Sequence, residues 1–185
     1  KAIRYIISIH VPIILVVSVP LFLGWEYASI FSPVHIIFME LVMGPTCSIV
    51  NENEATEQGL MSRPPEPREK GFISLNNLTL SIIQGLVITA FAIGVYSWGL
   101  NQKWSEETIR TMVFLLLITA NIVLSLANRS FYHSMFLMMK TKNELMTYIL
   151  GATVLCVVAI LTIPAVSAFF QVTLLSYDMI LSSIG

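Results

Sequence analysis

The sequence predicts an all-α protein, a polytopic membrane helical bundle of about six transmembrane helices. Of its 185 residues, 56% are hydrophobic and only 11% are charged, whereas about 25% of the residues of a typical soluble domain are charged. Long apolar stretches, close to the roughly 20 residues that a spanning helix needs, alternate with polar connections. These observations exclude a soluble domain and predict an integral membrane protein.

Six apolar stretches are candidates for spanning helices. The sixth stops at the end of the sequence and is either a clipped span or an amphipathic helix. An uninterrupted apolar stretch of this length favours a membrane helix over a buried helix of a soluble core. The stretches cover about residues 3–24, 34–50, 78–100, 109–128, 145–163 and 168–184.

The connections between these stretches predict the orientation in the membrane. Eight of the ten basic residues lie before the first stretch, near its start, or in the connections 51–76 and 128–144. The connections 25–33 and 101–108 hold only Lys103 and, at the following helix start, Arg110. Because basic loops remain in the cytoplasm, we expect the N-terminus, 51–76 and 128–144 to be cytoplasmic, in a protein of the plasma membrane. Four aromatic residues would then lie near the outer boundary: Trp25, Tyr27, Trp98 and Trp104.

Charge and cysteine content exclude other classes of function. The 10 basic and 11 acidic residues nearly cancel, so no nucleic-acid partner is expected. Cys47 and Cys156 both lie in apolar stretches, where we expect small buried side chains and no disulfide. The chain opens at Lys1 directly onto an apolar stretch, with neither Met nor a cleavable signal. We therefore expect it to be a piece of a longer protein.

Glu40 is the main candidate for function, because it is a carboxylate within an apolar stretch. A charge at membrane depth is costly and usually faces a polar cavity, an ion path or a partner. Gly44 and Pro45 follow one turn later and predict a helix break that frees backbone carbonyls near Val42. Together they predict part of an ion-binding site, although a carboxyl group that only joins helices is the alternative.

Two further polar residues are candidates for the same ion pathway. His10, two residues before Pro12 in the first stretch, could bind a metal, titrate or pair with Glu40, but a histidine that is simply hydrogen-bonded fits equally well. Asn121 in the fourth stretch is expected to form an inter-helix hydrogen bond, with a role as a neutral oxygen ligand as the alternative.

Small residues at a spacing of four predict close helix packing. Ser81, Gly85 and Thr89 have this spacing in the third stretch, and Thr147 and Gly151 have it in the fifth. Such positions let two membrane helices approach closely. We expect packing, and no ligand, at both.

Three segments carry a family resemblance: IRYIIS at 3–8, PVHIIFMELVMGP at 33–45 and LMSRPPEPREKGFIS at 60–74. Along its whole length the chain resembles the C-terminal membrane region, helices five to ten, of a calcium-pump-like type II P-type cation-transporting ATPase. The stiff, proline-rich part of 51–76 would dock near the phosphorylation domain. The resemblance implies that the ATPase domains precede Lys1, because the family's DKTGT phosphorylation motif does not occur here.

The resemblance also places expected ion ligands, and this chain departs from several of them. His10 stands where the family has an Asn, and Ile13 where it has a Glu. Glu40, Met43 and Gly44 stand where the family's sixth helix has Asn, Thr and Asp. Calcium prefers six to eight oxygen ligands, so this set argues against calcium and suits a proton or a smaller cation.

The sequence therefore predicts the membrane portion of an ATP-driven cation pump. Its implied partners are the lipid bilayer, the transported cation and the remaining N-terminal and cytoplasmic domains of the same pump. ATP and Mg²⁺ are implied for the full-length pump, with no cofactor in this segment, which alone could not hydrolyse ATP. The alternative is a non-transporting structural or regulatory membrane module of pump ancestry. A secondary transporter or channel ranks third, since residues 1–100 and 101–185 show no inverted repeat.

Overall fold

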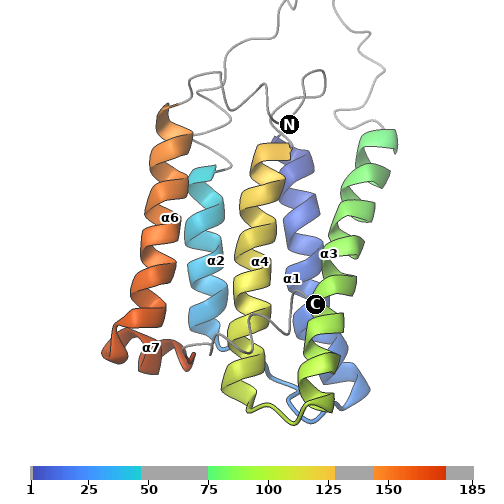
Figure 1. The fold of residues 1–185 in the computed structure, drawn as a ribbon. Coiled ribbons are helices and arrows are strands. Elements are labelled where there is room, and N and C mark those ends of the chain that lie inside the picture. Colours follow the sequence, from blue (N-terminus) through green and yellow to red (C-terminus); the bar gives the residue numbers. More distant parts are fainter. Residues whose placement is uncertain (1, 47–74, 128–143, 174–185) are drawn as a thin grey trace, which may run out of the picture.

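The computed structural model describes residues 2–46, 75–127 and 144–173, and these residues form a bundle of helices (Figure 1). No strand occurs among them, which confirms the predicted all-α class. The helices are α1 (Ala2–Leu23), α2 (Pro33–Pro45), α3 (Leu75–Asn101), α4 (Glu106–Ala127), α6 (Glu144–Thr162) and α7 (Pro164–Phe170).

Four of the described helices are long and apolar enough to cross a membrane. They contain the spans Ile3–Leu23, Leu78–Asn101, Glu106–Ala127 and Leu145–Thr162, which confirms four of the six predicted stretches to within a few residues. The second stretch forms the shorter helix α2, and residues 47–50 lie outside the described part of the chain.

The sixth predicted stretch began at the wrong residue. Ala168 lies inside α7, which starts at Pro164 and stops at Phe170. Gln171 adopts a left-handed conformation, with φ of 51°, so the helix cannot continue through it. Residues 174–184 of that stretch lie outside the described residues.

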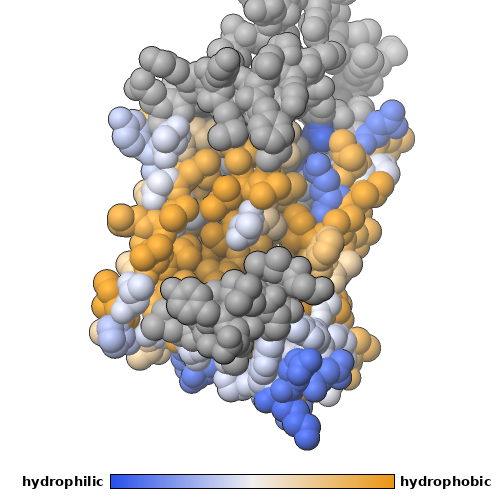
Figure 2. Space-filling view, viewed as in Figure 1, coloured by the Kyte–Doolittle hydropathy of each residue, from blue (hydrophilic) through white to orange (hydrophobic). Residues whose placement is uncertain are grey.

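The helices stand side by side, and the described connections gather at one end of the bundle (Figure 1). Connections 24–32 and 102–105 and helix α7 lie at one end, and the start of α1 and the close of α4 lie at the other. Hydrophobic residues cover the middle of the face in Figure 2, and hydrophilic residues gather towards both ends. Successive described helices from α1 to α6 run in alternating directions between the two ends, as the predicted order of spans requires. Residues 51–74 and 128–143 lie outside the described part.

Helices α1 and α3 make the most extensive contact in the bundle. Ser81, Gly85 and Thr89 are all buried on α3, which confirms their predicted packing role. A Cβ atom added at Gly85 would lie 2.7 Å from Val11 Cβ and 3.1 Å from the Ser8 carbonyl oxygen. Because Pro12 has no N–H for that carbonyl, the glycine lets α3 cover a backbone oxygen that the α1 helix leaves without its usual bond.

Helix α6 is packed differently from the prediction. Thr147 and Gly151 are exposed, and a Cβ at Gly151 would meet no atom within 4 Å. Cys156 is exposed as well, so its predicted burial is wrong. The helix contacts α2 and α7 along its other side, and residue spacing alone did not reveal which side that would be.

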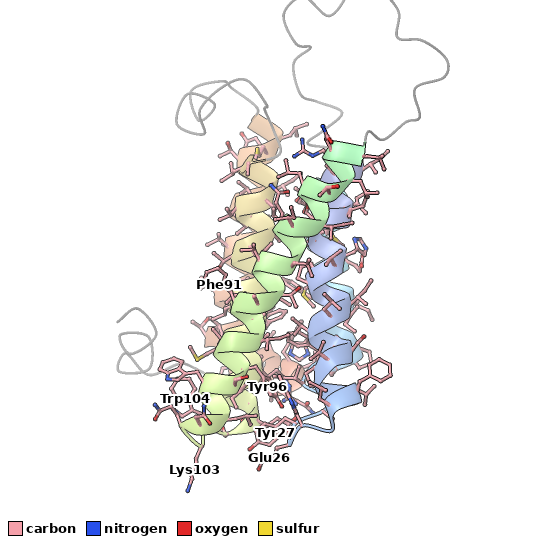
Figure 3. The ribbon with its side chains drawn as sticks, turned by 90° about the vertical axis from the view of Figure 1, so that its right-hand side faces the viewer. Glu26, Tyr27, Phe91, Tyr96, Lys103 and Trp104 are labelled. Atoms are coloured by element: carbon pink, nitrogen blue, oxygen red, sulfur yellow. The ribbon has the colours of Figure 1, made fainter. Side chains whose placement is uncertain are left out.

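Aromatic and charged side chains fix the connections at one end of the bundle. The Tyr96 hydroxyl donates to the Tyr27 carbonyl oxygen and accepts from the Tyr27 N–H, both at 3.1 Å. The Trp25 ring stacks on Tyr96 with centroids 5.0 Å apart, and Trp98 packs edge-on against Trp104. Tyr27, Tyr96 and Trp104 lie at this end in Figure 3. The predicted aromatic residues therefore share one end of the molecule.

Candidate ion site between α1 and α2

His10 and Glu40 are placed together by the rotation of α1. Tyr5 and Ser8 are buried on the face of α1 that packs on α4 and α3. With about 100° per residue, His10 lies about 140° around the helix from Tyr5. This rotation turns the imidazole towards α2, where it meets the Glu40 carboxyl group.

The two ring nitrogens of His10 have different neighbours. His10 Nε2 lies 3.4 Å from Glu40 Oε1, while His10 Nδ1 lies 2.8 Å from the Ile6 carbonyl oxygen. A carbonyl oxygen only accepts, so Nδ1 carries a proton and donates it to Ile6. Nε2 therefore faces the Glu40 carboxyl group.

The pair lies at the surface of the described bundle and is not enclosed. The His10 side chain is 37% exposed and the Glu40 side chain 50% exposed. The apolar neighbours of Glu40 in the sequence therefore do not bury it among the described residues, although its carboxyl group does meet α1. The reason is architectural: α3 and α4 cover the other faces of α1, and no described helix covers this one.

Asn121 does not join the pair. It is buried on α4, and its Oδ1 accepts a hydrogen bond from the Tyr5 hydroxyl. Tyr5 and His10 occupy different faces of α1, so the helix itself separates Asn121 from Glu40. Asn121 thus forms the inter-helix hydrogen bond that was expected from the sequence. The structure does not bring Asn121, His10 and Glu40 into one site.

Helix α2 continues through Gly44 and Pro45, where the sequence predicted a break. The described helix runs through Gly44 to Pro45, and the Thr46 N–H bonds to the Met43 carbonyl oxygen. The Thr46 hydroxyl donates to the Val42 carbonyl oxygen at 2.9 Å. The Val42 carbonyl oxygen, which was expected to lack a partner, therefore has a side-chain donor. Because residues 47–50 lie outside the described part, a break followed by further helix stays a prediction.

The described residues do not contain a complete metal site. No three His, Cys, Asp or Glu side chains come together among residues 2–46, 75–127 and 144–173. Ile13 and Met43, which occupy positions where the resemblance leads one to expect oxygen ligands, are buried in the apolar core. Chemically, the pair can hold a proton or contribute one carboxylate oxygen and one imidazole nitrogen to a cation.

His35 is a polar residue of potential functional importance that the sequence analysis missed. It is completely buried near the start of α2, where its ring packs against Phe31, Phe114 and Phe170. The Ser32 N–H donates to His35 Nδ1 at 3.3 Å. Ser32 and His35 stand at the spacing of a capping box, directly before an apolar run. That spacing was the signal available in the sequence.

Fold and site together define a polytopic helical membrane protein that holds a carboxylate–imidazole pair between two neighbouring helices. Residues 28–185 match the family described as "Cation transporting ATPase, C-terminus". The chain belongs to this family and is the membrane part of a cation-transporting ATPase.

A relative of known description agrees with this assignment. The chain is 23% identical over 168 residues to "Calcium-transporting ATPase 1" of Yarrowia lipolytica (strain CLIB 122 / E 150). The alignment covers 90% of this chain and 18% of that protein. The chain thus spans less than a fifth of its relative's length, and the similarity concerns this region alone.

Proposed function

We propose that the chain forms half of the ion pathway of an ATP-driven cation pump in the plasma membrane. In this proposal His10 and Glu40 take up the transported cation or a proton, and further domains of the same pump supply ATP hydrolysis with Mg²⁺. The N-terminus and the segments 51–76 and 128–144 lie on the cytoplasmic side. The observation that carries the proposal is the 3.4 Å approach of His10 Nε2 to Glu40 Oε1 at the surface of the apolar bundle.

The chemistry of the pair favours a proton or a small cation over calcium. The pair offers one carboxylate and one imidazole, far fewer than the six to eight oxygens that calcium takes. A cation and a proton would compete for the same two atoms, Glu40 Oε1 and His10 Nε2.

A non-transporting structural or regulatory module of pump ancestry is the second candidate. The hydrogen bond from Tyr5 to Asn121 favours it, because it occupies an oxygen that a cation site would use. Under this alternative the His10–Glu40 pair only holds α1 against α2.

The substitution Glu40→Gln in the full-length pump tests the proposal. Glutamine keeps the size and the hydrogen-bonding ability of the side chain but removes its charge and its titration. We expect cation-stimulated ATP turnover to be lost, with normal expression and membrane insertion. His10→Gln should give a partial loss and should alter the pH dependence of turnover.

Glu26→Gln is the matched control, because it makes the same chemical change at an exposed residue of the 24–32 connection. Its turnover should equal that of the unmodified pump. If Glu40→Gln also retains near-normal cation-stimulated turnover, Glu40 is not a ligand and the structural module is the better interpretation.

A further inference from the structure

His35 closes a junction between α2, α4 and α7 at the end of the bundle that holds the 24–32 connection (Figure 1). Its ring lies edge-on to Phe114 of α4 and Phe170 of α7, with centroid distances of 5.1 Å and 5.7 Å. Phe38, one turn along α2, packs on the same two phenyl rings. His35 is the titratable member of this aromatic junction.

The hydrogen bonds of His35 specify its neutral form. Ser32 donates its backbone N–H to His35 Nδ1, so this nitrogen holds a lone pair. The Ser32 hydroxyl lies 2.9 Å from the same nitrogen, and the His35 N–H bonds back to the Ser32 carbonyl oxygen. The neutral ring therefore carries its proton on Nε2. A second proton would have to enter at Nδ1 and would end the bond from the Ser32 N–H.

The charged neighbours of His35 also oppose a second proton. Arg110 of α4 is buried close enough to act on the imidazole electrostatically, and it is paired with Glu106. Arg110 Nη1 donates to the Gln171 carbonyl oxygen at 3.1 Å, directly after α7. The remaining elements contribute Ser32 and Phe31 from the connection and Phe170 from α7, and α6 carries no charged side chain over 145–162. An imidazolium would therefore face a second cation in an apolar junction.

We propose that His35 makes the docking of α7 onto α2 and α4 sensitive to the pH on that side of the membrane. At neutral pH the imidazole accepts from Ser32 and fills the space between the phenyl rings. On acidification the ring takes up a proton, loses the Ser32 bond and repels Arg110, whose guanidinium holds Gln171. The segment from α7 to Thr173 then separates from the start of α2.

A buried reporter at the docked segment tests this proposal in the full chain in lipid nanodiscs. Val172 is buried beside the Thr173–Thr111 hydrogen bond. The reporter is Val172→Cys in a chain whose Cys47 and Cys156 are replaced by Ser. This cysteine reacts with a maleimide only when the segment opens. The measured quantity is the ratio of two labelling rates, that of this protein and that of a second protein that has the same reporter cysteine and also carries His35→Gln. Glutamine at this position can still accept from the Ser32 N–H as in a capping box, but it does not titrate. The ratio also cancels the pH dependence of the thiol reaction.

We expect the ratio to rise as the pH falls, by up to about tenfold for each pH unit, because the open form binds one more proton. Addition of His10→Gln or His133→Gln should leave this rise intact. A ratio that stays constant with pH overturns the proposal, and so does a rise that disappears with His10→Gln. If His35→Gln is not folded by circular dichroism, His35→Phe, which fills the same space without titrating, replaces it and must give the same rise.

Discussion

The Tyr5 hydroxyl donates a hydrogen bond to Asn121 Oδ1, joining α1 to α4. Both side chains are buried, at 1% and 4% exposure, so neither can exchange this bond for one with water. This bond occupies the amide oxygen that was a candidate cation ligand. It also fixes the rotation of α1 that turns His10 towards Glu40.

Tyr5→Phe should lower the stability of the bundle by about 1 kcal/mol, the usual size of a polar contact between membrane helices. The phenyl ring fills the same space, and only the hydrogen bond to Asn121 is lost. Thermal unfolding of the full chain in nanodiscs measures the change. Tyr148→Phe is the control, because Tyr148 is 71% exposed and its midpoint should not move. Equal midpoints for the two variants would show that the bond does not stabilise the fold.

Gly85→Ala should separate α1 from α3 and destabilise the chain by about 1–3 kcal/mol. The new methyl group would lie 2.7 Å from Val11 Cβ and 3.1 Å from the Ser8 carbonyl oxygen, and neither atom can move without its backbone. Gly94→Ala on the same helix is the control, because a Cβ there meets no atom within 4 Å. It should be neutral or slightly stabilising, since alanine favours a helix by up to about 1 kcal/mol over glycine. The opposite order of thermal midpoints would contradict the observed packing.

Arg110→Lys should loosen the end of the bundle at which α7 lies. Arg110 donates to the Ile30 carbonyl oxygen at 2.6 Å, to the Gln171 carbonyl oxygen at 3.1 Å and to Glu106. A lysine ammonium cannot span three separated acceptors, and each buried acceptor left without a donor costs about 1–3 kcal/mol. Hydrogen exchange over residues 164–173 should accelerate in this variant. Lys103→Arg is the control, because Lys103 is exposed, and it should leave hydrogen exchange over residues 164–173 unchanged. Equal exchange in the two variants would show that Arg110 does not hold this segment in place.

Cysteine labelling in intact cells tests the predicted orientation. Ser105 lies in the connection between α3 and α4, at the same end as residues 24–32. Ser62 lies in the segment 51–76, which contains Arg63, Arg68 and Lys70. With Cys47 and Cys156 replaced, an impermeant reagent added outside should modify Ser105→Cys and spare Ser62→Cys, because basic segments remain cytoplasmic. If the reagent labels Ser62→Cys and spares Ser105→Cys, the orientation is the reverse of the predicted one.

Sequence reasoning located the long helices well because their signal is local. An apolar run of about 20 residues specifies a membrane helix by itself, since every backbone polar group is then bonded within the segment. The same local logic identified Ser81, Gly85 and Thr89 as a packing surface. It failed at the start of the sixth stretch, where Pro164 and the left-handed Gln171 confine α7 to a few residues.

The pairing of polar side chains depended on tertiary structure. Periodicity places Tyr5 and His10 on different faces of α1, but it does not say that α4 packs on one face or that Glu40 of α2 meets the other. That choice is made by the packing of whole helices, in which Gly85 admits α1 and Tyr5 reaches Asn121. Hence the residue types that can hold a cation or a proton, Glu40 and His10, were evident from the sequence alone. Their pairing, the separation of Asn121 from them and the burial of His35 among phenyl rings follow from contacts between segments far apart in the chain, which no local pattern encodes.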